Sequence, residues 1–136
     1  MPTARERLLL VDDNAQILET TARYLSARGF EVVTSDSALG VSSLMRQHRP
    51  AIIVLDVMMP ALNGDKLARV LTSQRAQQKT PIILYSAMDE EQLYAMVSEI
   101  PGCSYVVKSQ GLGALYAEIL TRLESGDSGA QTGDRG

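Results

Sequence analysis

The sequence predicts an α/β fold, in which helices cover both faces of a parallel β-sheet. Short apolar runs recur along the chain, segments with helical periodicity separate them, and prolines fall between the two kinds of segment. The runs at residues 8–11 and 52–55 are apolar at every position, which is typical of strands buried on both faces. We therefore expect a strand and a helix to alternate five times along the chain.

The five expected strands are short and rich in Val, Ile, Leu or Tyr. They cover residues 8–11, 30–33, 52–55, 82–85 and 105–107. Between them the residues that face the core recur at intervals of three or four, which indicates helices packed on the sheet. The positions that mark the five helices are Ile17, Thr21, Tyr24 and Leu25; Val41, Leu44 and Met45; Leu67, Val70 and Leu71; Leu93, Met96, Val97 and Ile100; and Leu112, Leu115, Ile119 and Leu123.

Length and composition indicate one domain. The chain has 136 residues, and we expect the folded domain to span residues 1–124. Residues 125–136 contain no large apolar side chain and are expected to form a disordered tail.

The composition argues against several classes of protein. The formal net charge is -3 and Lys and Arg are scattered, so the basic patch of a nucleic-acid-binding protein is absent. Cys103 is the single cysteine, the N-terminal segment lacks the features of a secretory signal, and no apolar run reaches the roughly 20 residues needed to cross a bilayer. We expect a cytoplasmic protein that contacts neither membrane nor nucleic acid directly.

Polar residues follow the ends of the expected strands. Asp12 and Asp13 follow the first strand, Asp56 the third, Ser86 the fourth and Lys108 the fifth. Right-handed crossovers place the carboxyl ends of parallel strands at one edge of the sheet, where ligands bind in folds of this class. We therefore expect these five side chains to converge.

These residue types together suit phosphoryl transfer. An aspartate can attack phosphorus and form an acyl phosphate, because its oxygen needs no deprotonation at neutral pH. Mg²⁺ bridges carboxylates and a phosphoryl oxygen, a lysine adds positive charge, and a hydroxyl adds a hydrogen bond. The pattern predicts metal binding by Asp12 and Asp13, with Asp56 as nucleophile, Ser86 as hydroxyl and Lys108 as cation.

Four segments add to this pattern, each at the end of a strand. They are an acidic-pair strand at residues 9–14, an aspartate loop with Pro and Gly at residues 55–64, the Tyr-Ser-Ala of residues 85–87, and the Tyr-Val-Val-Lys of residues 105–108. In this order they resemble the receiver domain of bacterial two-component response regulators, of the single-domain type. The resemblance extends from about Arg7 to Leu123.

The resemblance implies a flavodoxin-like three-layer sandwich with five parallel strands in the order 2-1-3-4-5. It further implies that Asp56 accepts a phosphoryl group from a phosphohistidine on a sensor histidine kinase or histidine phosphotransfer protein, without turnover as an enzyme. Mg²⁺ would be bound by Asp13, Asp56 and the backbone carbonyl of Met58, and by Asp12 through a water.

The resemblance also implies a conformational switch. Ser86 would turn toward the phosphoryl oxygen and Tyr105 would follow it inward, changing the surface formed by the fourth helix, the fifth strand and the fifth helix, where a downstream protein binds. The fourth helix carries no Lys or Arg through Ile100, so we expect a monomer or weak dimer.

Two other functions remain open from the residues alone. One is a receiver-like binding module that is never phosphorylated. The other is a small aspartyl-phosphate phosphatase of the haloacid-dehalogenase type with Asp12 as nucleophile, although that family has a second acid where this chain has Asn14. Taken singly, Asp12 and Asp13 could also be solvated helix-capping residues, and Tyr105 a half-buried strand aromatic.

The chain departs from the family pattern at two places. Ser109 follows Lys108 where many members have a proline, so the geometry of that peptide bond is an open question. Met58 and Met88 border the site at positions that are often polar in the family. We hypothesise that these apolar side chains hinder an attacking water and lengthen the life of the acyl phosphate.

Overall fold

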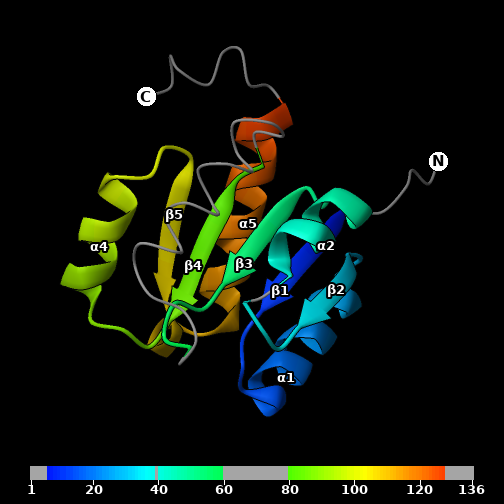
Figure 1. Ribbon diagram of the computed structural model, residues 1–136, viewed down its shortest axis with the longest axis horizontal. Coiled ribbons are helices and arrows are strands. Elements are labelled where there is room, and N and C mark those ends of the chain that lie inside the picture. Colours follow the sequence, from blue (N-terminus) through cyan, green and yellow to red (C-terminus); the bar gives the residue numbers. More distant parts are fainter. Residues whose placement is uncertain (1–5, 39, 60–79, 128–136) are drawn as a thin grey trace.

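The computed structural model describes residues 6–38, 40–59 and 80–127, and Figure 1 shows how the elements are arranged. In chain order they are β1 (Arg7–Val11), α1 (Ala15–Ala27), β2 (Glu31–Ser35), α2 (Val41–His48), β3 (Ile52–Leu55), β4 (Ile82–Ser86), α4 (Glu90–Ser98), β5 (Cys103–Val107), the short 3₁₀ turn η1 (Lys108–Gln110) and α5 (Leu112–Asp127).

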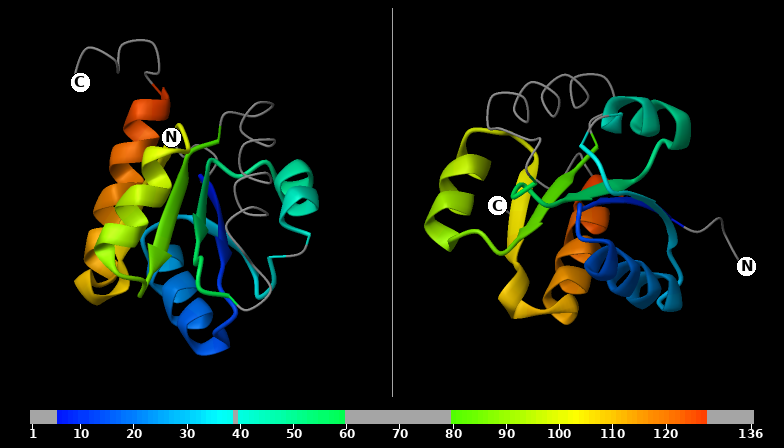
Figure 2. Two further views of the ribbon diagram at one scale, coloured as in Figure 1. Left: turned by 60° about the vertical axis from the view of Figure 1, so that its left-hand side comes forward. Right: turned by 60° about the horizontal axis from the view of Figure 1, so that its bottom comes forward.

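The five strands form one parallel sheet in the order β2-β1-β3-β4-β5, as the resemblance implied. Helices α1 and α5 cover one face, and α2 and α4 cover the other (Figures 1 and 2). The prediction of an α/β three-layer sandwich is confirmed.

Strand β1 shows why the central runs are apolar at every position. Leu8 and Leu10 pack in the cluster that contains residues of α1 and α5, whereas Leu9 and Val11 pack in the cluster that contains residues of α2 and α4. Successive side chains of a strand point to opposite faces, so a strand covered on both faces has no position left for solvent. All four of these side chains are buried.

The ends of the elements differ in detail from the predicted ones. Strand β2 begins at Glu31, one residue after the predicted start. Phe30 is not part of the strand and instead packs with Leu25 in the core. Helix α5 continues to Asp127, three residues past the boundary expected at 124. The predicted helix at Leu67, Val70 and Leu71 and the tail from residue 128 lie outside the described residues.

Helix α1 begins directly after Asn14, the last of the polar residues that follow β1. The Asn14 side-chain oxygen accepts hydrogen bonds from the backbone N–H groups of Gln16 and Ile17, both at 3.1 Å, and so caps the helix. The helix ends at Ala27, and two residues later Gly29 has a φ of 99°, which glycine adopts readily. None of the helices in the described part of the chain is long and apolar enough to span a membrane.

Candidate functional site

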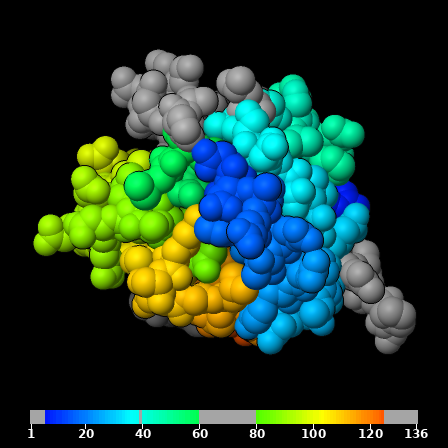
Figure 3. Space-filling view, turned by 90° about the horizontal axis from the view of Figure 1, so that it is seen from below, coloured from blue at the N-terminus to red at the C-terminus, as the bar shows by residue number. Residues whose placement is uncertain are grey.

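The site lies at the carboxyl edge of the sheet, between neighbouring strands. Hydrogen bonds continue one step past the strand ends, from the Asp12 N–H to the Ser35 carbonyl at 3.1 Å and from the Asp56 N–H to the Val11 carbonyl at 3.0 Å. Both aspartates are therefore fixed by sheet-like bonding rather than by a loose loop. Figure 3 looks onto this edge, where the segments that follow β1, β4 and β5 meet.

Lys108 joins the two aspartates. Its Nζ donates to Asp12 Oδ2 at 2.7 Å and to Asp56 Oδ2 at 2.9 Å. Both aspartates are 6% exposed, so the pair of carboxylates is held close together in a buried position around one ammonium. One negative charge remains after Lys108 is counted, which favours a further cation at this site.

The protonation of Lys108 reflects these contacts. Burial disfavours the charged ammonium, but its hydrogen bonds to Asp12 and to Asp56, with the attraction of both carboxylates, outweigh burial and raise the pKa of Lys108 above its usual value. Lys108 is therefore a permanent positive charge at neutral pH.

The remaining carboxylate oxygens bind the loops that follow the strands. Asp12 Oδ1 accepts a hydrogen bond from the Asn14 N–H at 2.9 Å, and Asp56 Oδ1 accepts one from the Met58 N–H at 2.9 Å. Each carboxylate thus has one oxygen on its own loop and one on Lys108. This pattern fixes both carboxylates before any ligand arrives.

Asp13 is placed differently from its neighbour. Asp12 is buried, whereas the side chain of Asp13 is exposed. Within the described residues no group of three His, Cys, Asp or Glu side chains is arranged around one point. The structure therefore brings Asp12, Asp56 and Lys108 together but leaves Asp13 at the margin. The donors present are carboxylate oxygens with net negative charge, which fits a hard cation such as Mg²⁺.

Ser86 is the last residue of β4 rather than the first residue after it. Its side chain is 0% exposed, and its Oγ accepts a hydrogen bond from the Met88 N–H at 3.2 Å. A hydroxyl has one O–H donor beside two acceptor lone pairs, so accepting from Met88 does not use the O–H of Ser86. The peptide bond between Lys108 and Ser109 is trans, and it begins the η1 turn.

Tyr105 lies on β5 with its ring against the cluster between the sheet and α4, and with its hydroxyl directed outward. The hydroxyl donates to Glu90 Oε2, the carboxylate of the first residue of α4, at 2.8 Å. The hydrogen bond to Glu90 raises the pKa of the Tyr105 phenol above its usual value.

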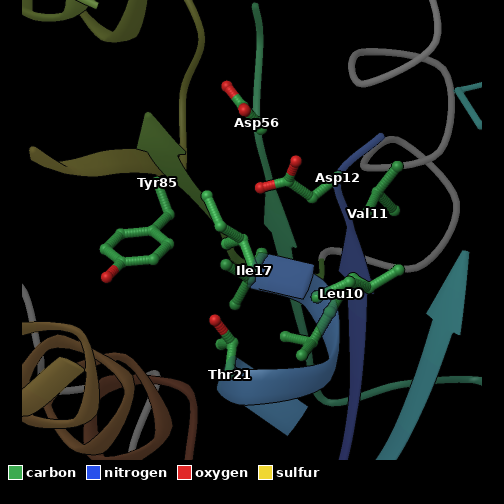
Figure 4. A pocket seen from close by; sticks show the side chains of 9 residues that line it. Leu10, Val11, Asp12, Ile17, Thr21, Asp56 and Tyr85 are labelled. Atoms are coloured by element: carbon green, nitrogen blue, oxygen red, sulfur yellow. The ribbon is translucent and has the colours of Figure 1, made fainter. Parts of the chain in front are cut away.

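A small pocket under the two aspartates contains residues that the sequence pattern did not single out as site residues. Figure 4 shows Tyr85, Ile17 and Thr21 around it, together with Asp12 and Asp56. Tyr85 is 7% exposed, burial raises the pKa of its phenol, and the Lys108 Nζ lies 6.0 Å from its ring centroid. Its position directly before Ser86, facing the opposite side of β4, is the signal that could have found it.

Comparison with known proteins identifies a family that this chain resembles. The family model described as "Response regulator receiver domain" matches residues 8–120. The DNA-binding response regulator MtrA of Mycobacterium tuberculosis is 30% identical over 127 residues, which are 93% of this chain and 54% of that protein. The probable transcriptional regulator ycf27 of Porphyra purpurea is 33% identical over 127 residues, which are 93% of this chain and 51% of that protein. The chain thus spans about half the length of these curated relatives.

Solved structures agree on the fold. A two-component response regulator from Clostridium difficile has a TM-score of 0.77 at 17% identity, over 88% of this chain and 97% of that one. The BeF3-activated N-terminal receiver domain of RstA from Klebsiella pneumoniae has a TM-score of 0.76 at 24% identity, over 87% of this chain and 98% of that one. By its family match, its relatives and its sheet order, this chain belongs to the response regulator receiver domains of two-component systems.

Proposed function

We propose that this receiver domain accepts a phosphoryl group on Asp56 from a phosphohistidine of a sensor histidine kinase or histidine phosphotransfer protein. One observation carries the proposal: Asp56 is a buried carboxylate whose two oxygens are held by Lys108 and by the Met58 N–H. The family acts in two-component signalling and is generally not a family of turnover enzymes.

In the proposed transfer, an Asp56 carboxylate oxygen attacks the phosphorus of the phosphohistidine. The new P–O bond forms as the P–N bond breaks, and the electron pair of that bond returns to the imidazole. The contact of Lys108 with Asp56 places its ammonium where it can neutralise charge on the phosphoryl oxygens. The Met58 N–H keeps the other Asp56 oxygen in a fixed direction.

Receiver domains of this family typically use Mg²⁺, and the oxygen donors here fit that ion. We assign it to Asp13, Asp56 and the backbone carbonyl of Met58, with Asp12 acting through a water. When bound, it supplies charge neutralisation and orientation of the phosphoryl group. Asp13 is exposed at the margin of the site, where it is accessible to an ion from solvent.

The proposed output is a change in surface. Ser86 donates its O–H to a phosphoryl oxygen, and Tyr105 moves inward behind it, so that the face of α4, β5 and α5 changes for a downstream protein. MtrA is described as DNA-binding, and the matched region covers only about half of it. We propose that the region described here acts in the cytoplasm through protein contacts, as a monomer or weak dimer without direct contact to nucleic acid.

The test is labelling by acetyl phosphate with and without Mg²⁺, followed by mass-spectrometric mapping of the modified residue. Wild type should be labelled on Asp56 only with Mg²⁺, and Asp56→Asn should not be labelled. Absence of label in wild type would instead favour the binding module that is never phosphorylated. Lys108 contacts both carboxylates, so either could in principle be modified. Mapping shows whether the phosphoryl group is on Asp56 or on Asp12, the nucleophile expected of a phosphatase.

A further inference from the structure

We propose that Glu90 is a positioning residue that keeps Tyr105 outward in the resting state and so opposes its inward movement on phosphorylation. This inference rests on the proposed function, because it concerns the equilibrium between the resting and the phosphorylation-competent state. It adds to the Ser86 and Tyr105 pair a residue on α4 that sets how readily the switch responds.

The contact is direct and joins two elements. The Tyr105 hydroxyl donates to Glu90 Oε2 at 2.8 Å, from the middle of β5 to the first residue of α4. Tyr105 is also paired with Leu84 of β4, so its backbone is fixed by the sheet. Only the side chain can move, and the Glu90 bond restrains that side chain.

Among the described residues, Glu90 forms no ion pair with a basic side chain. A hydrogen bond to an ionised acceptor is stronger than one between neutral groups. The Tyr105 phenol donates to this exposed carboxylate, and the bond stabilises the outward position of Tyr105.

The same short connection carries Ser86 and Glu90. The Ser86 Oγ accepts from the Met88 N–H, and α4 begins two residues later at Glu90. A rotation of Ser86 toward Asp56 therefore acts on the connection between β4 and α4. The other end of this connection is Glu90, which binds the Tyr105 hydroxyl. The Tyr105–Glu90 bond exists only with Tyr105 outward, and an interaction made in one of two states shifts the equilibrium toward that state.

Glu91 provides a matched control. It is the next residue of the same helical turn, it is exposed, and its substitution by Gln removes the same charge. A difference between the two variants then reports the contact with Tyr105 rather than the general electrostatics of the acidic start of α4.

The experiment compares wild type, Glu90→Ala, Glu91→Ala, Tyr105→Phe and the Glu90→Ala/Tyr105→Phe double variant. The initial rate of Mg²⁺-dependent labelling by acetyl phosphate should rise roughly two- to fivefold in Glu90→Ala, as for loss of an exposed charged contact. Glu91→Ala should stay at the wild-type rate. In the Tyr105→Phe background, Glu90→Ala should add nothing.

A second measurement is independent of phosphorylation. In protein with ¹³C-labelled tyrosine rings, the phenol resonance of Tyr105, identified by its absence in Tyr105→Phe, should titrate at a lower pH in Glu90→Gln than in wild type. Glu91→Gln should leave it in place. Tyr94 on α4 also contributes to the field at Tyr105 and is unchanged in both variants.

The outcomes separate two failures. If wild type is labelled on Asp56 but Glu90→Ala is labelled at the same rate, or if Glu90→Ala gives its full effect without the Tyr105 hydroxyl, the role of Glu90 is overturned and the proposed function stands. If wild type is not labelled at all, the proposed function fails and this inference fails with it. An unchanged titration of the Tyr105 phenol in Glu90→Gln also overturns the role of Glu90.

Discussion

The buried site and the proposed switch are built from opposite kinds of polar contact. In the first, Lys108 holds the carboxylates of Asp12 and Asp56 in a buried cluster, and backbone N–H groups hold their other oxygens. In the second, a single solvent-exposed bond joins Tyr105 to Glu90. The buried cluster is fixed in advance and suits chemistry, whereas the exposed bond is inexpensive to break and suits a movable part.

The largest expected effect comes from removing the nucleophile in the buried cluster. Asp56→Asn keeps the shape of the side chain but lacks the anionic oxygen that attacks phosphorus, so labelling by acetyl phosphate should be lost completely. Intact-mass measurement after incubation with Mg²⁺ checks this. Labelling of the variant at the wild-type level would show that another residue accepts the phosphoryl group.

Lys108→Met should destabilise the fold, because it leaves two buried carboxylates without their shared cation. Breaking a buried pair costs more than an exposed one, and since Lys108 is only partly buried we expect a loss of about 1–3 kcal/mol in the free energy of unfolding at pH 7. Urea denaturation measures this. Adding Asp12→Asn should recover part of the loss, and a double variant no more stable than Lys108→Met would contradict the account.

The contribution of Lys108 to stability should disappear at alkaline pH. Its folded-state pKa is raised above the unfolded value, so the contribution is fully present below the ordinary lysine pKa of about 10.4 and is lost as pH rises through the folded pKa. The difference in stability between wild type and Lys108→Met should therefore be constant from pH 7 to 9 and shrink above that range. Using the difference cancels the alkaline titration of the tyrosines remote from Lys108, and Tyr85→Phe in both proteins removes the tyrosine whose phenol interacts with the Lys108 charge.

Replacing the methionines beside the site tests whether apolar side chains protect the acyl phosphate. Met58 is 55% exposed and Met88 is half-buried, so both are within reach of solvent near the site. The double variant Met58→Asn plus Met88→Glu should shorten the lifetime of the phosphorylated protein, because polar side chains beside the site can orient an attacking water and assist its deprotonation. An unchanged rate of dephosphorylation would remove this hypothesis.

The smallest expected effect comes from removing the exposed bond between Tyr105 and Glu90. Tyr105→Phe removes the exposed bond to Glu90 but keeps the ring that packs between the sheet and α4. Its midpoint of urea denaturation should match that of wild type. A clear loss of stability would show that the Tyr105–Glu90 bond is structural rather than a restraint on a switch.

The buried parallel strands and the convergence of three site residues follow from local patterns, whereas the order of the strands was implied by the resemblance to receiver domains. Doubly apolar runs identify buried parallel strands, and a polar residue directly after such a run must lie at the carboxyl edge of the sheet. Asp12, Asp56 and Lys108 meet there for this reason. Asp13 is exposed, and within the described part of the chain no hydrogen bond joins it to these three residues.

Other contacts depend on tertiary distances that no local pattern contains. Glu90 is fifteen positions from Tyr105 and carries no signal beyond the acidic start of a helix. Tyr85 belongs to the Tyr-Ser-Ala motif, but its distance from Lys108 follows only from the fold. The sequence predicts Phe30 in a strand because side-chain burial and strand membership give the same hydrophobic signal.

The division of the core by the sheet has a consequence for how such a protein can diverge. Side chains of α1 pack with α5 on one face, while α2 and α4 pack in a separate cluster on the other. A substitution that reshapes the outer surface of α1 therefore need not disturb the packing of α4. The surfaces carried by α1 and by α4 can therefore change independently, on opposite faces of the five-stranded sheet.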